Sequence, residues 1–172
     1  MAVHSHTKSP HSTFLKHDDY MTPQHAWADI KHIIPKDKVI WEAFYGDGIS
    51  GYHLKKLGFN VIHEPIDFFE NDLGEVVVSN PPFSQVPKIL ARLVELDKPF
   101  ILIMPTLKLC TKYVREIFKK VEKLKIIIPR KRIHFVKHLN GKPVEGWKKN
   151  TCFDCFYYCW RIEGIDGITW LD

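Results

Sequence analysis

Long hydrophobic runs are absent from this sequence. No stretch approaches the roughly 18 consecutive apolar residues that a membrane-spanning helix needs. The first residues do not show the charged and then apolar pattern of a secretory signal peptide, and no internal repeat is evident. We therefore expect a soluble, intracellular protein that does not have a membrane as its partner.

Cysteine is also scarce, since the 172 residues include four, at Cys110, Cys152, Cys155 and Cys159. The dense spacing of the last three suggests zinc, but they fall in an apolar and aromatic segment with the pattern of a buried strand. Alternation along a strand would place Cys152 on the face opposite Cys155 and Cys159, whereas a structural zinc site needs four ligands turned to one point. We therefore expect no metal, and reduced cysteines in the core rather than disulfides.

Length and charge set the class of protein. With 172 residues, of which 45% are hydrophobic, the chain is long enough for one domain with an ordinary core. Its net charge of +5 and isoelectric point near 9.0 favour a polyanionic partner. Residues 1–17 are rich in His, Ser, Thr and Pro without periodicity, which predicts a flexible N-terminal arm. The folded domain is expected to span residues 18–172.

Apolar periodicity predicts alternating strands and helices in this domain. Helices are expected at 24–33, 49–57, 86–96 and 111–123, with Thr22 as the cap of the first and Pro23 at its first position. Strands are expected at 38–44, 60–63, 75–78, 100–105, 125–128 and 152–162. The alternation predicts an α/β fold of Rossmann-like type, with a mostly parallel central sheet, helices on both faces and an antiparallel pair formed by the last two strands.

The most informative segment is the turn at 79–84, Ser-Asn-Pro-Pro-Phe-Ser, which directly follows an apolar strand. Pro81 and Pro82 lack backbone N–H donors and hold φ near about −65°, so the side-chain amide of Asn80 and the carbonyl of Pro81 are held as acceptors. Phe83 adds a ring face for stacking. An exocyclic amine on a base needs an acceptor for each N–H and a flat wall against its ring. The turn therefore predicts a site that grips a planar amino group.

A glycine-rich turn lies upstream, between the strand at 38–44 and the helix at 49–57. Gly46 and Gly48 allow the backbone to approach a ligand closely, and the amino end of the helix attracts a carboxylate or phosphate. Further on, Glu64 follows a second strand, where doubly wound folds place an acid for ribose hydroxyls. Asp67, followed by Phe68, is another candidate contact. Together these residues predict a nucleotide-type cofactor site.

In the order and content of these motifs, the chain resembles the class I S-adenosylmethionine-dependent methyltransferases, specifically the adenine-N6 group. The segments that match are 19–23, 42–48, Glu64, 67–69 and 79–83. Residues 77–84 are most similar to EcoRI-type DNA adenine methyltransferases and their small phage or viral relatives. The resemblance covers residues 18 to 110, and beyond them it rests on the general fold pattern.

The resemblance implies a single methyltransferase domain that transfers a methyl group from S-adenosyl-L-methionine to the N6 amino group of adenine in nucleic acid, with DNA favoured over RNA. It implies that the catalytic residues are Asn80, Pro81, Pro82 and Phe83. The implied cofactor-binding residues are Tyr20, Thr22, Glu42, Phe44, Gly46, Gly48, Glu64, Asp67, Phe68 and Asn80. The protein would work in the cytoplasm, or in the nucleus or viral factory of a host cell.

Within this set, the resemblance places Tyr20 and Thr22 near the methionine end of the cofactor, with the two glycines alongside it. Glu64 would bind the ribose hydroxyls, and Asp67 with Phe68 would frame the adenine. A strong base is unnecessary, because the sulfonium carries the driving force and the protein mainly aligns carbon, sulfur and nitrogen.

A basic segment around residues 130–150, between the last two expected strands, is the natural substrate loop. Basic and aromatic side chains interleave there, as phosphate binding and base stacking require. The candidate substrate-binding residues are Phe83, Arg130, Arg132, Lys137, Trp147, Lys148 and Lys149. A solvated charged loop without a ligand is the alternative interpretation of this segment.

Several alternatives stay open at this point. RNA adenine-N6 methyltransferases of ribosomal RNA or of messenger caps also carry Asn-Pro-Pro-Phe, so the turn identifies the amine better than the polymer. Glutamine-modifying relatives usually carry Asn-Pro-Pro-Tyr, and Phe83 weighs mildly against them. No long recognition region follows Phe83, so a helper subunit or a homodimer could supply recognition. An inactive cofactor-binding subunit is a further alternative, against which the intact turns argue.

Overall fold

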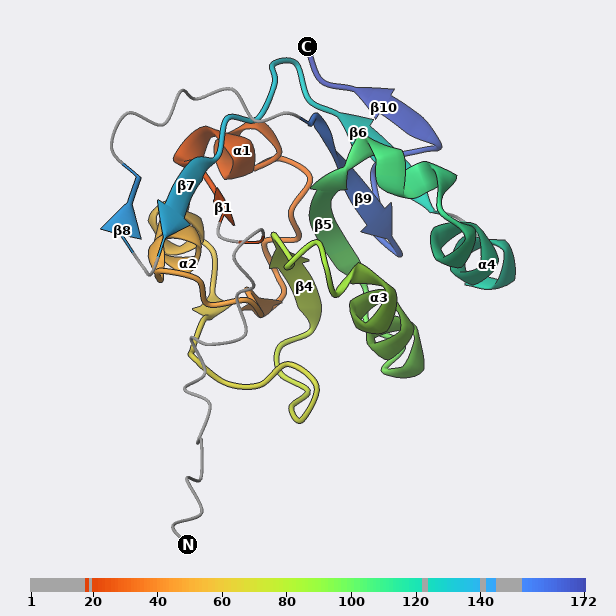
Figure 1. Ribbon diagram of the computed structural model, residues 1–172, viewed down its shortest axis with the longest axis horizontal. Helices are drawn as coiled ribbons and strands as arrows, with labels where there is room; N and C mark the ends of the chain where they lie inside the picture. Colours follow the sequence, from red (N-terminus) through yellow and green to blue (C-terminus); the bar gives the residue numbers. More distant parts are fainter. Residues whose placement is uncertain (1–17, 19, 122–123, 140–141, 145–152) are drawn as a thin grey trace, which may run out of the picture.

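The computed structural model describes residues 18, 20–121, 124–139, 142–144 and 153–172, and it confirms the predicted α/β fold class (Figure 1). The arm predicted for residues 1–17 lies outside these residues. In the described part of the chain, no helix is long and apolar enough to cross a membrane.

A seven-stranded sheet forms the centre of the protein. In spatial order its strands are β10 (Ile168–Trp170), β6 (Lys125–Ile128), β9 (Cys155–Trp160), β5 (Phe100–Pro105), β4 (Val76–Ser79), β2 (Ile40–Trp41) and β3 (Val61–Ile62). Only β9 is antiparallel to its neighbours, and every other pairing in this sheet is parallel. The mostly parallel sheet and the antiparallel pairing of β6 with β9 were predicted and are confirmed, whereas β10 was not predicted.

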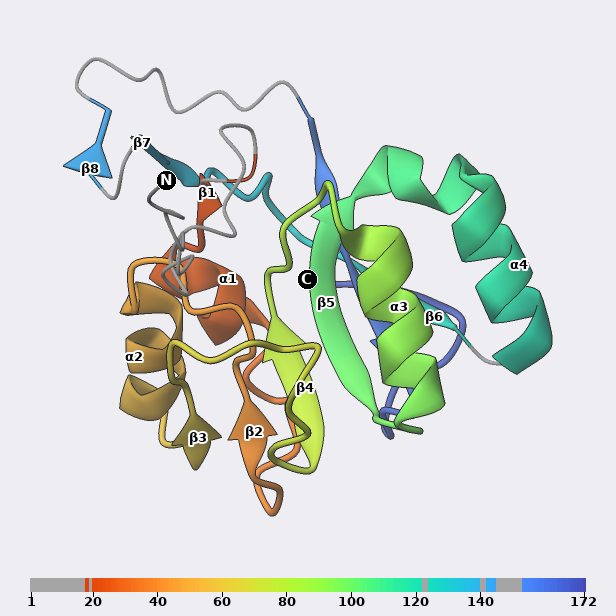
Figure 2. The same ribbon diagram turned by 60° about the horizontal axis from the view of Figure 1, so that its bottom comes forward.

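Helices cover both faces of this sheet (Figure 2). The layer on one face consists of α1 (Gln24–Asp29) and α2 (Ile49–Lys56), and the layer on the other consists of α3 (Val86–Glu95) and α4 (Lys112–Val121). Successive side chains of β4 point to opposite faces of the sheet and so contact both helix layers. Val76 and Val78 pack with Trp27 of α1, while Val77 packs with Leu93 of α3. The parallel strands are therefore buried on both faces, which explains their nearly unbroken apolar sequences.

The helix α3 shows how the sequence pattern positions these layers. Ile89, Leu90 and Leu93 are fully buried and recur at the three- and four-residue spacing of one helix face. Burial of each such side chain contributes about 1.5–3 kcal/mol. A short 3-10 helix, η2 (Thr106–Cys110), connects β5 to α4.

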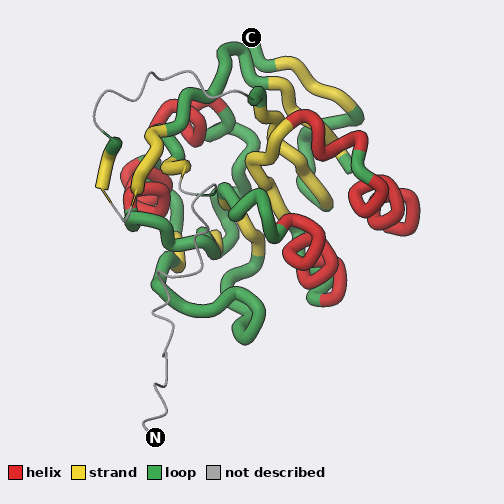
Figure 3. Tube along the Cα trace, viewed as in Figure 1, coloured by secondary structure: helices red, strands yellow, loops and turns green. Residues whose placement is uncertain are grey.

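A second sheet of three strands was not predicted from the sequence. It consists of β1 (Tyr20–Met21), β7 (Val136–Leu139) and β8 (Lys142–Pro143), all antiparallel, and it lies beside α1 and α2 (Figures 1 and 3). The segment around 130–150 is thus not only a loop, as the sequence predicted. Each of these strands is short, and β1 finds its partner far along the chain, so no local pattern signals the pairing.

The start of α1 also corrects the sequence prediction. Pro23, not Thr22, occupies the N-cap position, with an extended backbone at φ −71° and ψ 151°, and no side chain caps the helix. The Pro23 carbonyl accepts the Ala26 N–H at 3.1 Å, and Thr22 is 3% exposed. The helix ends at Asp29, before the predicted residue 33, because Ile30 leaves the helical region at φ −106° and ψ 12°.

The cysteines differ from one another in environment. Cys155 and Cys159 are buried on the same face of β9, as strand alternation predicts, and burial raises the pKa of both thiols. Cys110 is exposed at the end of η2, so the prediction that it lies in the core is wrong. Cys152 lies outside the described residues.

Candidate active site

The candidate site lies at the carboxyl ends of β2 and β4. From β2 the chain crosses through α2 to β3 on one side, and from β4 it crosses through α3 to β5 on the other side. Neighbouring strands whose crossovers run to opposite sides form a topological switch point, where open α/β sheets bind ligands. The glycine-rich turn follows β2 and the Asn80 turn follows β4, so the fold brings the two predicted motifs to this point.

Asn80 is held through its amide nitrogen. Nδ2 donates to the carbonyl oxygen of Tyr20 at 2.9 Å, and because a carbonyl can only accept, this contact settles which end of the amide faces Tyr20. The other end, Oδ1, is buried and has no hydrogen-bond partner among the described residues. A buried acceptor without a partner costs about 1–3 kcal/mol. Asn80 is therefore arranged as an acceptor, in agreement with the prediction from its turn.

The rest of this turn is fixed from two directions. The Asp18 carboxylate accepts the backbone N–H of Ser84, at 3.2 and 3.3 Å to its two oxygens, and also the Ser84 hydroxyl. Lys108 Nζ donates to the carbonyl of Phe83 at 3.1 Å, while Pro81 and Pro82 are buried. Asp18 and Lys108 were not predicted as site residues, and the one available signal was that Asp18 adjoins the matching segment at 19–23.

The ring of Phe83 belongs to an aromatic cluster with Tyr20, Phe135 and Phe153. Tyr20 stacks on it at a centroid distance of 6.3 Å and an interplanar angle of 22°. Phe135 and Phe153 meet it edge to face at 6.4 and 5.5 Å. Phe83 is half-buried, so this cluster holds the ring in place while part of its surface stays accessible.

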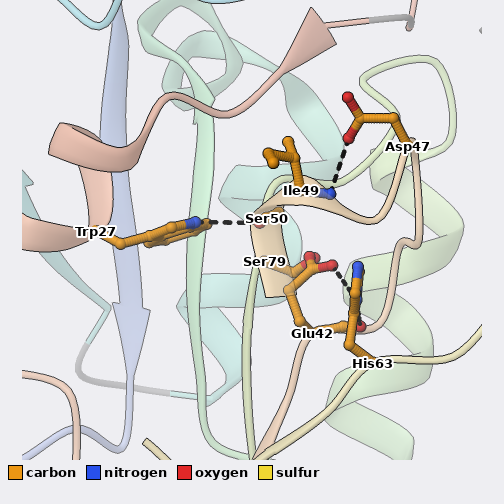
Figure 4. Close-up of polar contacts among 7 residues, drawn as sticks. All are labelled: Trp27, Glu42, Asp47, Ile49, Ser50, His63 and Ser79. Carbon is orange, nitrogen blue, oxygen red and sulfur yellow. Dashed lines mark hydrogen bonds and ion pairs between the residues drawn. The ribbon is translucent and has the colours of Figure 1, made fainter. Parts of the chain in front are cut away.

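Glu42, at the carboxyl end of β2, carries a buried carboxylate and is 1% exposed. The Ser79 hydroxyl donates to Oε1. His63 Nδ1 lies 2.6 Å from Oε2 and 2.9 Å from the Glu42 carbonyl oxygen (Figure 4). The structure thus places this predicted cofactor residue beneath the turns, with both carboxylate oxygens contacted by protein groups. His63 and Ser79 were not predicted to have this role, although Ser79 begins the matching segment 79–83 and His63 directly precedes Glu64.

The glycine-rich turn has the backbone conformation that its glycines predict. Gly46 and Gly48 have φ values of 58° and 85°, in the left-handed region that side chains disfavour. A Cβ on Gly48 would also lie 3.1 Å from the Tyr45 hydroxyl oxygen. Asp47 Oδ1 accepts the backbone N–H of Ile49 at 3.0 Å, which closes the start of α2 (Figure 4).

Two side-chain contacts hold the elements around this turn, and the first of them is buried. The indole N–H of Trp27 on α1 donates to the Ser50 hydroxyl in the first turn of α2, at 3.0 Å (Figure 4). On the side of the second sheet, His138 of β7 is 6% exposed, and its Nε2 lies 3.7 Å from Asp47 Oδ2. The small sheet is therefore connected to the glycine-rich turn as well as to the Asn80 turn.

The residues that follow β3 separate into exposed and buried groups. Glu64 and Asp67 are exposed, and Asp67 Oδ1 accepts the backbone N–H of Phe69 at 2.7 Å. The ring of Phe68 is 3% exposed and packs against Trp41 and Phe44, at centroid distances of 5.3 and 5.1 Å. Phe68 thus lies in the core below this turn, Phe44 is partly buried against that core, and Phe69 is the exposed aromatic residue of the turn.

The basic candidates differ in how far they are already engaged. Arg132 pairs with Asp154 through two nitrogens, with Nη2 at 2.9 Å from Oδ2, and these hydrogen bonds hold the pKa of Asp154 below its usual value. Arg130 is exposed, and Lys137 Nζ lies 6.0 Å from the centroid of the Tyr20 ring. Trp147, Lys148 and Lys149 lie outside the described residues. Within the described part, no three His, Cys, Asp or Glu side chains group as metal ligands.

Comparisons with known proteins give a structural likeness but no match to a family model or a curated protein. Among solved structures it is similar to precorrin-6y C5,15-methyltransferase from Geobacter metallireducens GS-15, with 14% identity and a TM-score of 0.41 over 84% of this chain and 95% of that chain. A likeness of this size carries no argument about fold or function, so the interpretation of the site rests on its own geometry and motifs.

Proposed function

We propose that this chain transfers a methyl group from S-adenosyl-L-methionine to the N6 amino group of adenine in nucleic acid, with DNA as the favoured substrate. The observation that carries the proposal is the buried Oδ1 of Asn80, an unpaired acceptor at the switch point of the sheet. Its amide nitrogen is already held by the Tyr20 carbonyl, so the oxygen is the end that a ligand would meet.

The turn supports the chemistry of an amine acceptor. An exocyclic amino group brings two N–H donors, which Asn80 Oδ1 and the Pro81 carbonyl would each accept. As the nitrogen becomes tetrahedral during transfer, these two bonds would strengthen, and the nitrogen lone pair would leave conjugation with the ring. No strong base is needed for this step. The half-buried ring of Phe83, fixed by its aromatic neighbours, would hold the plane of the base.

The ends of β2 and β3 fit the cofactor. When bound, S-adenosylmethionine supplies an activated methyl group on a sulfonium. The left-handed glycines Gly46 and Gly48 leave room for close backbone approach beside the amino end of α2. Glu64 and Asp67 are exposed where ribose hydroxyls and an adenine would be bound. Thr22 adjoins β1, which contacts the Asn80 turn, whereas Glu42, Phe44 and Phe68 would support the site from below.

The basic segment is the proposed substrate surface. Lys137 lies on β7, which pairs with β1, and the Tyr20 carbonyl of β1 holds Asn80. A phosphate bound by Lys137 would therefore be connected to the Asn80 turn through one small sheet. Arg130, Lys148 and Lys149 are the other proposed phosphate-binding residues. Trp147 would stack on a neighbouring or flipped base. A helper subunit or a second copy of the chain would add sequence recognition.

The direct test is transfer of a labelled methyl group to matched pools of double-stranded DNA, single-stranded DNA and RNA, followed by nucleoside mass spectrometry. N6-methyldeoxyadenosine is the expected product. N6-methyladenosine in RNA alone would keep the chemistry and overturn the DNA preference. No product in any pool despite cofactor binding, with or without copurifying proteins, would contradict the proposal.

A further inference from the structure

A buried hydrogen-bonded network joins the ends of three strands beneath the candidate site (Figure 4). Ser79, the residue before Asn80, donates to Glu42, and Glu42 in turn contacts His63 after β3. The His63 ring then stacks on Tyr45 of the glycine-rich turn, at a centroid distance of 4.8 Å and an angle of 18°. The network therefore connects the Asn80 turn to the glycine-rich turn through the buried side chains of Ser79, Glu42 and His63.

We propose that His63 is a positioning residue whose protonated form, paired with the buried Glu42 carboxylate, shapes the glycine-rich turn and makes cofactor affinity depend on pH. This inference rests on the proposed function, since it concerns the cofactor of that reaction. His63 itself is not a catalytic residue, because its contacts are with the protein and not with reacting atoms.

The packing around the His63 ring explains how a change in its protonation would affect the glycine-rich turn. On one side lies Tyr45, whose hydroxyl is next to Gly48. On the other side lies α2, so close that a Cβ on Gly51 would be 2.2 Å from the ring carbons of His63. A ring clamped between the turn and the helix cannot move without moving one of them. An imidazolium also attracts the face of an aromatic ring more strongly than a neutral imidazole does.

The charges around the ring favour the protonated form. Burial lowers the pKa of His63. The hydrogen bond to the Glu42 carboxylate and the negative charge of that carboxylate raise the pKa by more than burial lowers it, so the pKa lies above the ordinary 6.5. Lys55 on α2 opposes this shift. Nε2 is buried and has no hydrogen-bond partner among the described residues, so Glu42 is the group that offsets the buried charge. The Tyr45 phenol is the remaining titratable group against the ring.

The sign of the pH dependence follows from this direction. Since the pKa is raised in the folded protein, the charge–charge attraction between His63 and Glu42 is fully present below 6.5 and is lost as the pH rises through the folded value, whereas a neutral ring can still donate from Nδ1. Cofactor affinity should fall over the same interval. The affinity of a His63→Gln variant, which keeps a donor to Glu42 without a titratable charge, should be weaker at low pH and should lack this change.

The experiment measures the affinity of the full chain for S-adenosylhomocysteine by calorimetry from about pH 5.5 to 9, which spans the range of histidine titration. We expect an additional loss of roughly tenfold in the wild type relative to His63→Gln, corresponding to about 1.4 kcal/mol. Comparing the two curves cancels the titration of the ligand. The control is His53→Gln on α2, where burial lowers the histidine pKa, so the wild-type loss above 6.5 should persist.

Nuclear magnetic resonance titration of the histidines gives a readout that needs no ligand. The His63 pKa should lie above 6.5 in the wild type and fall below it in Glu42→Gln, where burial is no longer offset. If His63→Gln does not fold, the midpoint of the wild-type affinity loss must coincide with the measured His63 pKa. Binding with the same pH dependence in both proteins, or midpoints that disagree, would overturn the role of His63 alone. Absence of cofactor binding at every pH would overturn the proposed function and this inference with it.

Discussion

The two strands that meet at the switch point, β4 and β2, are followed by polar side chains that differ in their hydrogen-bond partners. Directly after β4, Asn80 keeps one acceptor buried and unpaired within the described chain. Directly after the neighbouring β2, Glu42 accepts the Ser79 hydroxyl at Oε1, and its Oε2 forms an ion-pair contact with His63 at 2.6 Å. Because β2 and β4 are direct neighbours in the sheet, with Ile40 opposite Val76, their positions in the sheet do not explain why Asn80 and Glu42 differ.

This contrast separates residues that act on a ligand from residues that maintain the shape of the site. An unpaired buried acceptor is a continuing cost, and it is offset when a donor from a ligand arrives. The Glu42 carboxylate accepts the Ser79 hydroxyl at Oε1 and lies against the His63 ring at Oε2, so it offers a ligand less, and removing it leaves both neighbours without their partner. We therefore expect changes at Asn80 to affect the reaction and changes at Glu42 to affect stability.

The largest expected effect is that of Asn80→Ala, which removes the side-chain oxygen proposed to bind the ligand. Methyl transfer should fall by at least about 10²–10³-fold, as when one stabilising hydrogen bond is removed from a transition state. Cofactor affinity should stay within a few fold, and the free energy of unfolding should fall by only about 1 kcal/mol with the loss of the Tyr20 contact. Single-turnover transfer and calorimetry would measure these quantities.

Asn60→Ala, which changes an exposed asparagine just before β3, is the matched control for that variant and should transfer at the wild-type rate. Loss of cofactor binding in Asn80→Ala, with the fold intact, would show that Asn80 serves the cofactor rather than the amine.

Glu42→Ala tests the structural side of the comparison. Its removal leaves the buried His63 without its counter-charge, so the free energy of unfolding should fall by about 3–5 kcal/mol. Urea denaturation would measure the loss. Glu64→Ala, at an exposed acid after β3, should change stability by no more than about 0.5 kcal/mol. If Glu42→Ala kept its stability and lost far more cofactor affinity than His63→Gln, Glu42 would be a ligand contact, as the sequence predicted.

Replacing Lys148 and Lys149 by Glu extends the comparison to the substrate. Two phosphate contacts would become repulsive, so KM for nucleic acid should rise roughly tenfold or more, with a smaller change in kcat. The salt dependence of KM should weaken in the same variant. Charge reversal at Lys88 and Lys119, two exposed lysines of the α3 and α4 layer, is the control. Equal effects in both pairs would indicate that net charge alone attracts the substrate.

The smallest expected effect is that of Ser50→Ala. The Ser50 hydroxyl accepts the indole N–H of Trp27 and contacts neither Asn80 nor Glu42 in the hydrogen bonds described above. The substitution leaves the buried indole N–H of Trp27 without a partner and should cost about 1 kcal/mol. Thermal unfolding would measure this change, and the rate of methyl transfer should stay that of the wild type. A reduced rate at unchanged stability would mean that the start of α2 takes part in the reaction.

Local sequence patterns predicted those parts of the fold whose structure depends on neighbouring residues. The bounds of β5 and β6 agree with the predicted 100–105 and 125–128, because each contains an unbroken apolar run next to a proline, Pro99 before β5 and Pro129 after β6. In contrast, the two-residue β1 forms a strand because β7 lies beside it, and β7 lies between β1 and β8. The same reason accounts for the substrate segment, whose pairing could not be predicted from its lysines and arginines.

At the site itself, the sequence determined which chemical groups are present and how the backbone must turn. Consecutive prolines lack donors whatever surrounds them, and Gly46 and Gly48 adopt φ values that favour glycine. Only the tertiary structure decided how the polar side chains are used. The Tyr20 carbonyl leaves Asn80 Oδ1 as the available end, and Ser79 and His63 occupy Glu42. Those partners come from other segments of the chain, and a hydrogen bond depends on distance and direction in space rather than on separation in sequence.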